Sequence, residues 1–200
     1  MFNEKFTAIS TLILGKLKQG LPPRLSYHCI SHFEDVLRQS IRIARAEDIQ
    51  NEEELFLLKT AALYHDSGFM FTYTGHEEKS CEIAEEDLTR LSITPMQIVK
   101  IKGLIIATRI PQNPATHLEQ VLCDADLDYL GRDDFYPIAA SLYRELKAFH
   151  FVKDEKEWNR IQVDFLSSHH YFTAASIRLR NEKKLMHLDH LRKIVDSCQD

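Results

Sequence analysis

Signals that begin and end helices recur along the whole chain, and they constrain its fold more than any other feature. Thr94-Pro95-Met96-Gln97 combines a capping residue, proline at the first helical position and glutamine at the third. Thr116 with Glu119, and Ser31 with Glu34, have the spacing of the capping box. No stretch shows the apolar–polar alternation of a half-buried strand. The sequence therefore predicts an all-α protein.

Apolar residues repeat with the helical period between these signals. In the first segment Phe6, Ile9, Ile13 and Leu17 share one face, and a glycine with two prolines follows. The same pattern predicts a helical bundle, with Trp158 as a core residue. We expect helices at about residues 3–18, 51–65, 77–91, 134–149, 156–168 and 173–197, with further helices beginning near residues 31, 94 and 116.

Length and charge limit the classes of function. Two hundred residues are enough for one domain with a sizeable core, so we expect a single domain over 1–200, with a motif-bearing part at about 27–131 and a helical tail at 132–200. Lys and Arg total 25 against 30 Asp and Glu, a net charge of −5. This balance argues against an extended nucleic-acid partner, although it leaves room for a local site that binds a small phosphorylated molecule.

The cysteines and the hydropathy predict a cytoplasmic protein. Cys29, Cys81, Cys123 and Cys198 are widely spaced and include no C-x-x-C pair, so we expect reduced thiols. The apolar stretch at residues 9–14 is short and interrupted by Ser10 and Thr11, unlike a secretory signal. No segment has the length of a membrane span, so a membrane is not expected as a partner.

The adjacent pair His65-Asp66 is the strongest chemical signal. It closes an apolar helical run, where an aspartate is rarely buried without a partner. His32 follows a helix start, and Asp124 lies among apolar neighbours, where a metal would compensate its charge. Such a mixed imidazole and carboxylate set favours Mn²⁺ or Fe²⁺, and Mg²⁺, Ni²⁺ and Zn²⁺ remain open.

The order of these residues, H…HD…D, resembles the signature of the HD superfamily of metal-dependent phosphohydrolases. Four stretches carry the resemblance, each with its local context: Tyr27–His32, Ala61–Phe69, His76–Ser80 and Cys123–Asp128. The resemblance implies an HD-type helical bundle in which His32, His65, Asp66 and Asp124 bind a divalent metal.

The stretch after His65-Asp66 and the acids near Asp124 refine that expectation. Ser67-Gly68-Phe69 lacks the basic residue that some HD subfamilies carry there, which favours a single metal ion. Helical spacing turns Asp126 about two hundred degrees away from Asp124, so both cannot face one ion. The family position favours Asp124, and Asp128, one turn on, is a candidate for a supporting role.

Catalytic and substrate-binding roles are then assigned by the resemblance. Asp66 is expected to orient or deprotonate water, and His28 to protonate the leaving group, unless His28 only caps a loop. His76 stays open between a ligand for a second metal, a phosphate contact and a plain helix start. Arg109 and Arg132, which each follow a helical segment near the motifs, are candidates for binding substrate phosphate, although a solvent-exposed arginine is the favoured interpretation of each taken alone.

The resulting expectation is an enzyme that hydrolyses a phosphate ester or anhydride, with a small phosphorylated molecule, in particular a nucleotide, as its substrate. The alternative is a non-catalytic HD module that binds a nucleotide or metal and signals through a partner. An intact ligand set favours the enzyme. A homodimer stays open, because the first helix, with Phe2 and Phe6 near its start, can pack on its own domain or on a second subunit.

Overall fold

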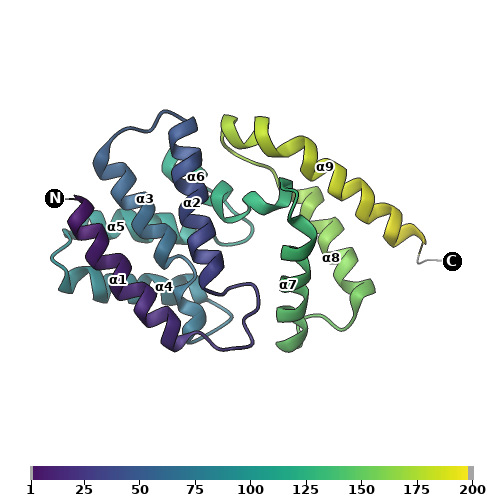
Figure 1. Ribbon diagram of the computed structural model, residues 1–200, viewed down its shortest axis with the longest axis horizontal. Coiled ribbons are helices and arrows are strands. Elements are labelled where there is room, and N and C mark those ends of the chain that lie inside the picture. Colours follow the sequence, from purple (N-terminus) through teal and green to yellow (C-terminus); the bar gives the residue numbers. More distant parts are fainter. Residues whose placement is uncertain (1, 198–200) are drawn as a thin grey trace.

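Helices make up the whole architecture that the computed structural model describes, which covers residues 2–197. Within that range there is no strand, and the all-α prediction is confirmed (Figure 1). The α-helices are α1 (Phe2–Gly20), α2 (Ile30–Ala46), α3 (Glu52–Tyr64), α4 (His76–Arg90), α5 (Pro95–Ala107), α6 (His117–Asp126), α7 (Phe135–Ala148), α8 (Glu155–Ser168) and α9 (Ala174–Ser197). Two short 3-10 helices, η1 (Ser67–Met70) and η2 (Asp128–Gly131), follow α3 and α6.

Most predicted helix starts are present with their side-chain caps. Thr94 and Thr116 each form a complete capping box, and the side chain of Asn51 accepts from two backbone amides of α3. The predicted box at Ser31 is wrong. The cap of α2 is Cys29, so Ser31 already lies inside the helix, and its hydroxyl is 3.2 Å from the Cys29 sulfur.

The N-terminal lobe, which we define as α1–α6 with η1, is built around α3. Every residue from Phe56 to Tyr64 except Lys59 is buried, because α1, α2 and α5 pack against different sides of this helix. An apolar core from Ile9 to Ala125 fills the lobe. Such complete burial explains why a helix ending in His65-Asp66 delivers both polar side chains to the interior of the protein.

The C-terminal lobe, η2 with α7–α9, has its own smaller core. That core includes Leu130, Phe135, Trp158 and Leu166, and α9 runs along α8 and η2 (Figure 1). The buried carboxylate of Asp128 helps to join the two lobes. It accepts hydrogen bonds from Arg42 of α2 and Arg180 of α9, at 2.6 and 2.9 Å.

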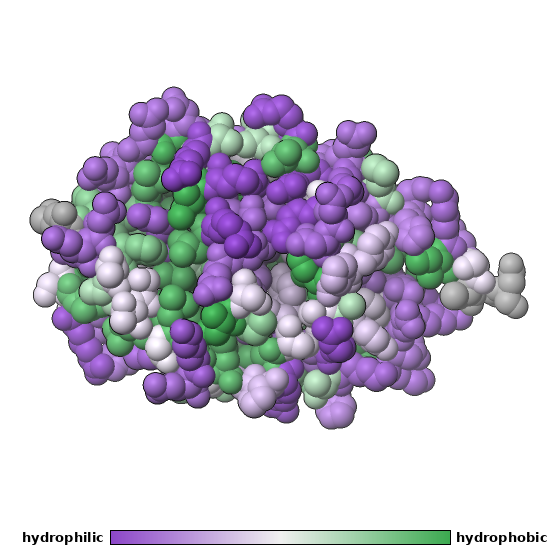
Figure 2. All heavy atoms as spheres, viewed as in Figure 1, coloured by the Kyte–Doolittle hydropathy of each residue, from purple (hydrophilic) through white to green (hydrophobic). Residues whose placement is uncertain are grey.

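Hydrophilic residues dominate the face shown in Figure 2, with hydrophobic residues in smaller patches between them. Among the described helices, none has the length and apolar character needed to cross a bilayer. Cys29, Cys81 and Cys123 are free thiols, as expected, and Cys198 lies outside the described residues.

Candidate metal centre

Two histidines and two aspartates converge inside the N-terminal lobe, with one ligand atom from each within 4.8 Å of all the others. The Nε2 atoms of His32 and His65 are 3.2 Å apart. Each also lies 3.2 Å from Oδ2 of Asp66 and 3.3–3.4 Å from Oδ1 of Asp126. These separations leave a common point between the four atoms, as a bound ion requires.

Three helices position the four side chains. His32 lies in the first turn of α2, and His65 caps the C-terminus of α3. Asp66 is the next residue and begins η1, while Asp126 is the last residue of α6. Because α2 packs against both α3 and α6, side chains far apart in the sequence meet at one place in the lobe.

The hydrogen bonding of His65 suits it to metal binding. Its Nδ1 is 3.0 Å from the Ala62 carbonyl oxygen, which can only accept, so Nδ1 carries the proton and Nε2 offers a lone pair to the cluster. Burial alone would lower the pKa of His65, but Asp66 and Asp126 raise it well above its usual value. The same two carboxylates raise the pKa of His32 to about 9 against its burial. The cluster thus attracts positive charge, which a divalent ion would supply.

Asp124, the predicted fourth ligand, lies elsewhere, and this part of the prediction is corrected. Its carboxylate accepts from the backbone amides of Phe172 and Thr173 at 2.9 and 2.8 Å, and from the Thr173 hydroxyl at 2.6 Å. Asp124 therefore ties α6 to the segment that begins α9. The helical geometry did exclude a shared ion for Asp124 and Asp126, and it is Asp126 that faces the histidines.

Asp128 and Arg132 take part in a network of ion pairs. Asp128 binds Arg42 and Arg180 and does not contact the two histidines of the cluster. Arg132 donates to Asp35 at 2.6 Å and to Asp134 at 2.5 Å. It also lines a cavity of about 230 Å³ that reaches His32 and Asp126. A phosphate contact for Arg132 would have to compete with these two carboxylates.

His28 stands beside the cluster and is held there by a buried carboxylate that the sequence analysis missed. Its Nδ1 donates to Oε1 of Glu145 on α7, and its Nε2 lies 3.7 Å from Oδ2 of Asp66. Oε2 of Glu145 accepts from the backbone amides of Tyr27 and His28 at 2.8 and 3.0 Å, and the Tyr73 hydroxyl donates to Oε1 at 3.1 Å. Burial would raise the pKa of Glu145, but these donors, His28 foremost, lower it. His28 is therefore fixed beside Asp66 by a contact to a residue outside its own loop.

His76 faces the other oxygen of Asp66. Its Nδ1 donates to the Tyr73 carbonyl, and its Nε2 lies 3.3 Å from Oδ1 of Asp66 and 3.6 Å from the Glu77 carboxylate. Phe69 stacks between the rings of His28 and His76, with centroid separations of 4.1 and 3.9 Å. Asp66 thus presents one oxygen to the metal cluster and the other to His76.

The turn after Asp66 places His76 close to the Asp66 carboxylate. The Gly68 amide donates to the Ser80 hydroxyl at 2.8 Å, which fixes η1 against α4. A Cβ at Gly68 would lie 2.0 Å from the carbonyl oxygen of His76, so only glycine permits this approach.

Arg109 lies at the edge of the site. Its guanidinium pairs with the exposed carboxylate of Glu78 and is 4.0 Å from that of Glu77. Because Arg109 is 44% exposed and already paired, a role in phosphate binding remains an expectation.

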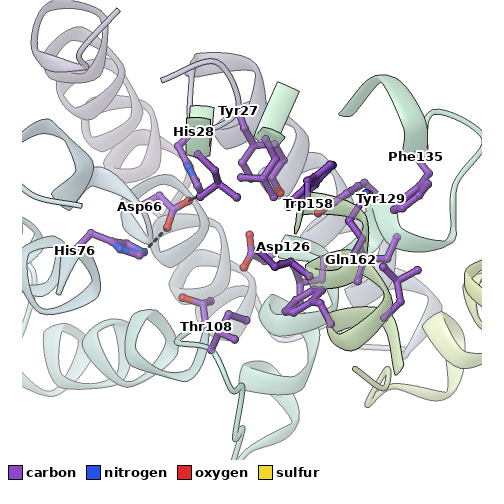
Figure 3. Close-up of a pocket in the computed structure, with 18 of the residues that line it drawn as sticks. Tyr27, His28, Asp66, His76, Thr108, Asp126, Tyr129, Phe135, Trp158 and Gln162 are labelled. Atoms are coloured by element: carbon purple, nitrogen blue, oxygen red, sulfur yellow. Dashed lines mark ion pairs between the residues drawn. The ribbon is translucent and has the colours of Figure 1, made fainter. Parts of the chain in front are cut away.

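A cavity of about 390 Å³ opens beside the cluster (Figure 3). Asp66, Asp126, His28 and His76 border it at the end formed by the N-terminal lobe, and Trp158 borders it from α8. The candidate ligands therefore face a space in which a small molecule can be bound.

Comparisons with known proteins give no relative: no protein-family model, curated protein or solved structure matches this chain. The function is therefore inferred from the residues of the site alone.

Proposed function

We propose that this protein is a metal-dependent phosphohydrolase, which cleaves a phosphate ester or anhydride. The observation that carries the proposal is the position of His28. A histidine fixed by a buried carboxylate stands 3.7 Å from a cluster of metal-binding atoms, at the border of a cavity. Phosphate hydrolysis needs an activated nucleophile on one side of phosphorus and a proton donor for the leaving group on the other.

The four ligands fit a divalent ion of the Mn²⁺ or Fe²⁺ type. Two imidazole Nε2 atoms and two carboxylate oxygens converge, and the carboxylates balance two positive charges. When bound, the ion would supply Lewis-acid polarisation of a phosphoryl oxygen and would make a water molecule more acidic. Mg²⁺, Ni²⁺ and Zn²⁺ are further candidates for the test.

Asp66 and His28 divide the proton transfers between them. As water attacks phosphorus, a new P–O bond forms, and the proton of the water moves to Oδ1 of Asp66, the oxygen that faces His76. The bond from phosphorus to the leaving oxygen breaks, and that oxygen takes the proton from Nε2 of His28. Glu145 holds the charged and neutral forms of His28 in one orientation, because it accepts from Nδ1 in both.

The test is release of phosphate from a panel of phosphate esters and nucleotides by metal-stripped protein, with and without Mn²⁺, Fe²⁺ or Mg²⁺. We expect turnover only with metal. His65→Ala and Asp66→Ala should each abolish metal binding and turnover while helicity stays largely intact, and His117→Ala, at an exposed histidine, should match the wild type.

Two outcomes would overturn the proposal. Full activity in a metal-free variant would show that the cluster is not the catalytic centre. Metal binding with tight nucleotide binding and no turnover would instead identify a non-catalytic module that senses its ligand, the alternative raised by the sequence.

A further inference from the structure

The cavity beside the metal cluster changes character along its length. At one end are the carboxylates of Asp66 and Asp126 with the imidazoles of His28 and His76 (Figure 3). The other end lies among apolar side chains of the C-terminal lobe. These come from α7 and α8 and from the residues between α6 and α7, and include Leu142, Leu146, Trp158, Ile161, Phe165 and Leu166.

The permanently charged side chains that the structure describes in the wall of this cavity are acidic. Among the described residues that line it, none is lysine or arginine, whereas Asp66, Asp126 and Glu77 are acidic. Arg109 lies in the sequence between the lining residues Thr108 and Ile110, and it is paired with Glu78.

This charge distribution limits the number of phosphate groups that the site accepts. A divalent ion would offset the charges of Asp66 and Asp126, and one phosphoryl group would bind at that ion. Each further phosphate would meet Glu77 or the apolar wall without a lysine or arginine to pair with, and an unpaired charge next to apolar surface is costly. Proteins that bind polyphosphates surround them with lysine, arginine or backbone amides.

We propose that the substrate is an ester of a single phosphoryl group with an uncharged, largely apolar body, and that nucleoside triphosphates and other polyphosphates are excluded. This inference rests on the proposed phosphohydrolase function. The phosphoryl group occupies the metal end, and the body lies between α7 and α8. The indole of Trp158 and the ring of Phe165 provide flat apolar surfaces for a planar group.

The first experiment compares KM and kcat/KM for 2-naphthyl phosphate, methyl phosphate and ATP with the metal-loaded protein. We expect the KM of the naphthyl ester to lie at least tenfold below that of the methyl ester, and its kcat/KM to exceed that of ATP at least a hundredfold. Hydrolysis of ATP as fast as that of the naphthyl ester would overturn the inference while leaving the phosphohydrolase proposal intact.

The second experiment measures ligand binding and does not depend on hydrolysis. Trp158 is the only tryptophan in the chain, so its fluorescence reports on the cavity. With Mg²⁺ present, phenylphosphonate should change this signal at concentrations at least tenfold below those needed for methylphosphonate. If the signal responds in this way but no ester is hydrolysed, the phosphohydrolase proposal fails and the ligand preference stands. Equal responses to the two phosphonates would overturn the preference.

A variant that introduces a positive charge tests whether the cavity wall sets this preference. Ile161 lines the cavity and is 38% exposed, so a lysine there can keep its ammonium group solvated at the edge. Ile161→Lys should lower the ratio of 2-naphthyl phosphate to ATP kcat/KM at least tenfold. Leu185→Lys, at a 50% exposed position on α9 outside the cavity lining, is the matched control and should leave the ratio unchanged. An unchanged ratio in Ile161→Lys would count against the inference.

Discussion

The imidazole of His28 donates its Nδ1 proton to the carboxylate of Glu145, a residue 117 positions further along the chain. Glu145 lies on α7 and is fully buried. The contact therefore connects the loop before α2, in the N-terminal lobe, to the C-terminal lobe. A histidine held in this way keeps Nε2 directed at the cavity, where the proposed proton transfer takes place.

Replacing Glu145 should weaken catalysis in a manner that depends on the leaving group. In Glu145→Gln, His28 loses its charged partner, so proton donation becomes less effective. We expect kcat for phenyl phosphate to fall about a hundredfold, which is within the usual contribution of general acid catalysis. For 4-nitrophenyl phosphate, whose leaving group needs little protonation, the loss should stay below about tenfold.

Metal content by elemental analysis should be the same in this variant as in the wild type. Glu155→Gln, at an exposed residue of α8, serves as the control and should retain full activity. Equal losses for the two esters would mean that Glu145 acts on stability rather than through His28.

Substitutions at Asp124 and Asp126 can distinguish a structural role from a role in metal binding. Asp126→Asn removes one of the two carboxylates among the four candidate ligands. Loss of a residue that merely supports a ligand costs roughly 10–100-fold in metal affinity, so the loss here should be at least that large. Titration of stripped protein with Mn²⁺ measures the affinity.

Asp124→Asn should give the opposite result. The variant keeps the four atoms of the cluster but weakens the hydrogen bonds to Phe172 and Thr173. We expect the free energy of unfolding to fall by about 1–3 kcal/mol, with Mn²⁺ affinity within a few-fold of the wild type. A loss of metal binding in Asp124→Asn alone would restore Asp124 as the ligand.

Arg132 is expected to contribute to stability. Its side chain is 13% exposed and joins Asp35 of α2 to Asp134 next to α7. Arg132→Ala should lower the free energy of unfolding by about 1–3 kcal/mol, because the partly buried carboxylate of Asp35 loses a hydrogen bond from a charged donor. Arg38→Ala, which removes a 69% exposed partner of the same Asp35, should cost about 0.5 kcal/mol or less. Urea unfolding measures both variants.

The side chain of His169 is expected to make the folded protein less stable in mild acid. Burial, reinforced by Lys184, lowers the pKa of His169 to about 3, whereas an unfolded chain has the ordinary value of 6.5. Between these values only the unfolded state binds the extra proton. Stability is thus retained above pH 6.5 and falls as the pH drops below it, by at most about 1.4 kcal/mol per pH unit from this residue.

His169→Asn should flatten that part of the pH profile, because asparagine keeps an acceptor near Lys184 but does not titrate. The relevant measurement is the difference between the two proteins in free energy of unfolding from pH 7 to pH 5. If the two profiles run parallel, His169 does not titrate as described.

Local signals explain why the helices could be predicted from the sequence. The Thr94 and Thr116 boxes depend on residues three positions apart, and both are present in the structure. The Ser31 pattern failed because a cap at Cys29 begins the helix two residues earlier. His65 and Asp66 could be predicted because a pair of metal-binding residues after an apolar run is visible without any knowledge of tertiary contacts, and His32 follows from its place after a helix start and from the order of the motif.

The remaining parts of the site depend on long-range packing. Asp124 and Asp126 are two residues apart on one helix, so only the rotation of α6 within the bundle decides which one faces His32. Glu145 lies in an ordinary amphipathic helix, and no local pattern distinguishes it from a surface glutamate. The cavity forms from side chains of both lobes, whose distance apart no sequence period encodes.

Gly68 gives the site a strict requirement on backbone shape. Its lack of a side chain lets the segment after Asp66 rest directly on the carbonyl of His76. Alanine at this position would have to push the start of α4 away, and the gap between Asp66 and His76 would widen although neither residue had changed. The chemistry of this centre is therefore sensitive to a single methyl group at a residue that has no chemical function of its own.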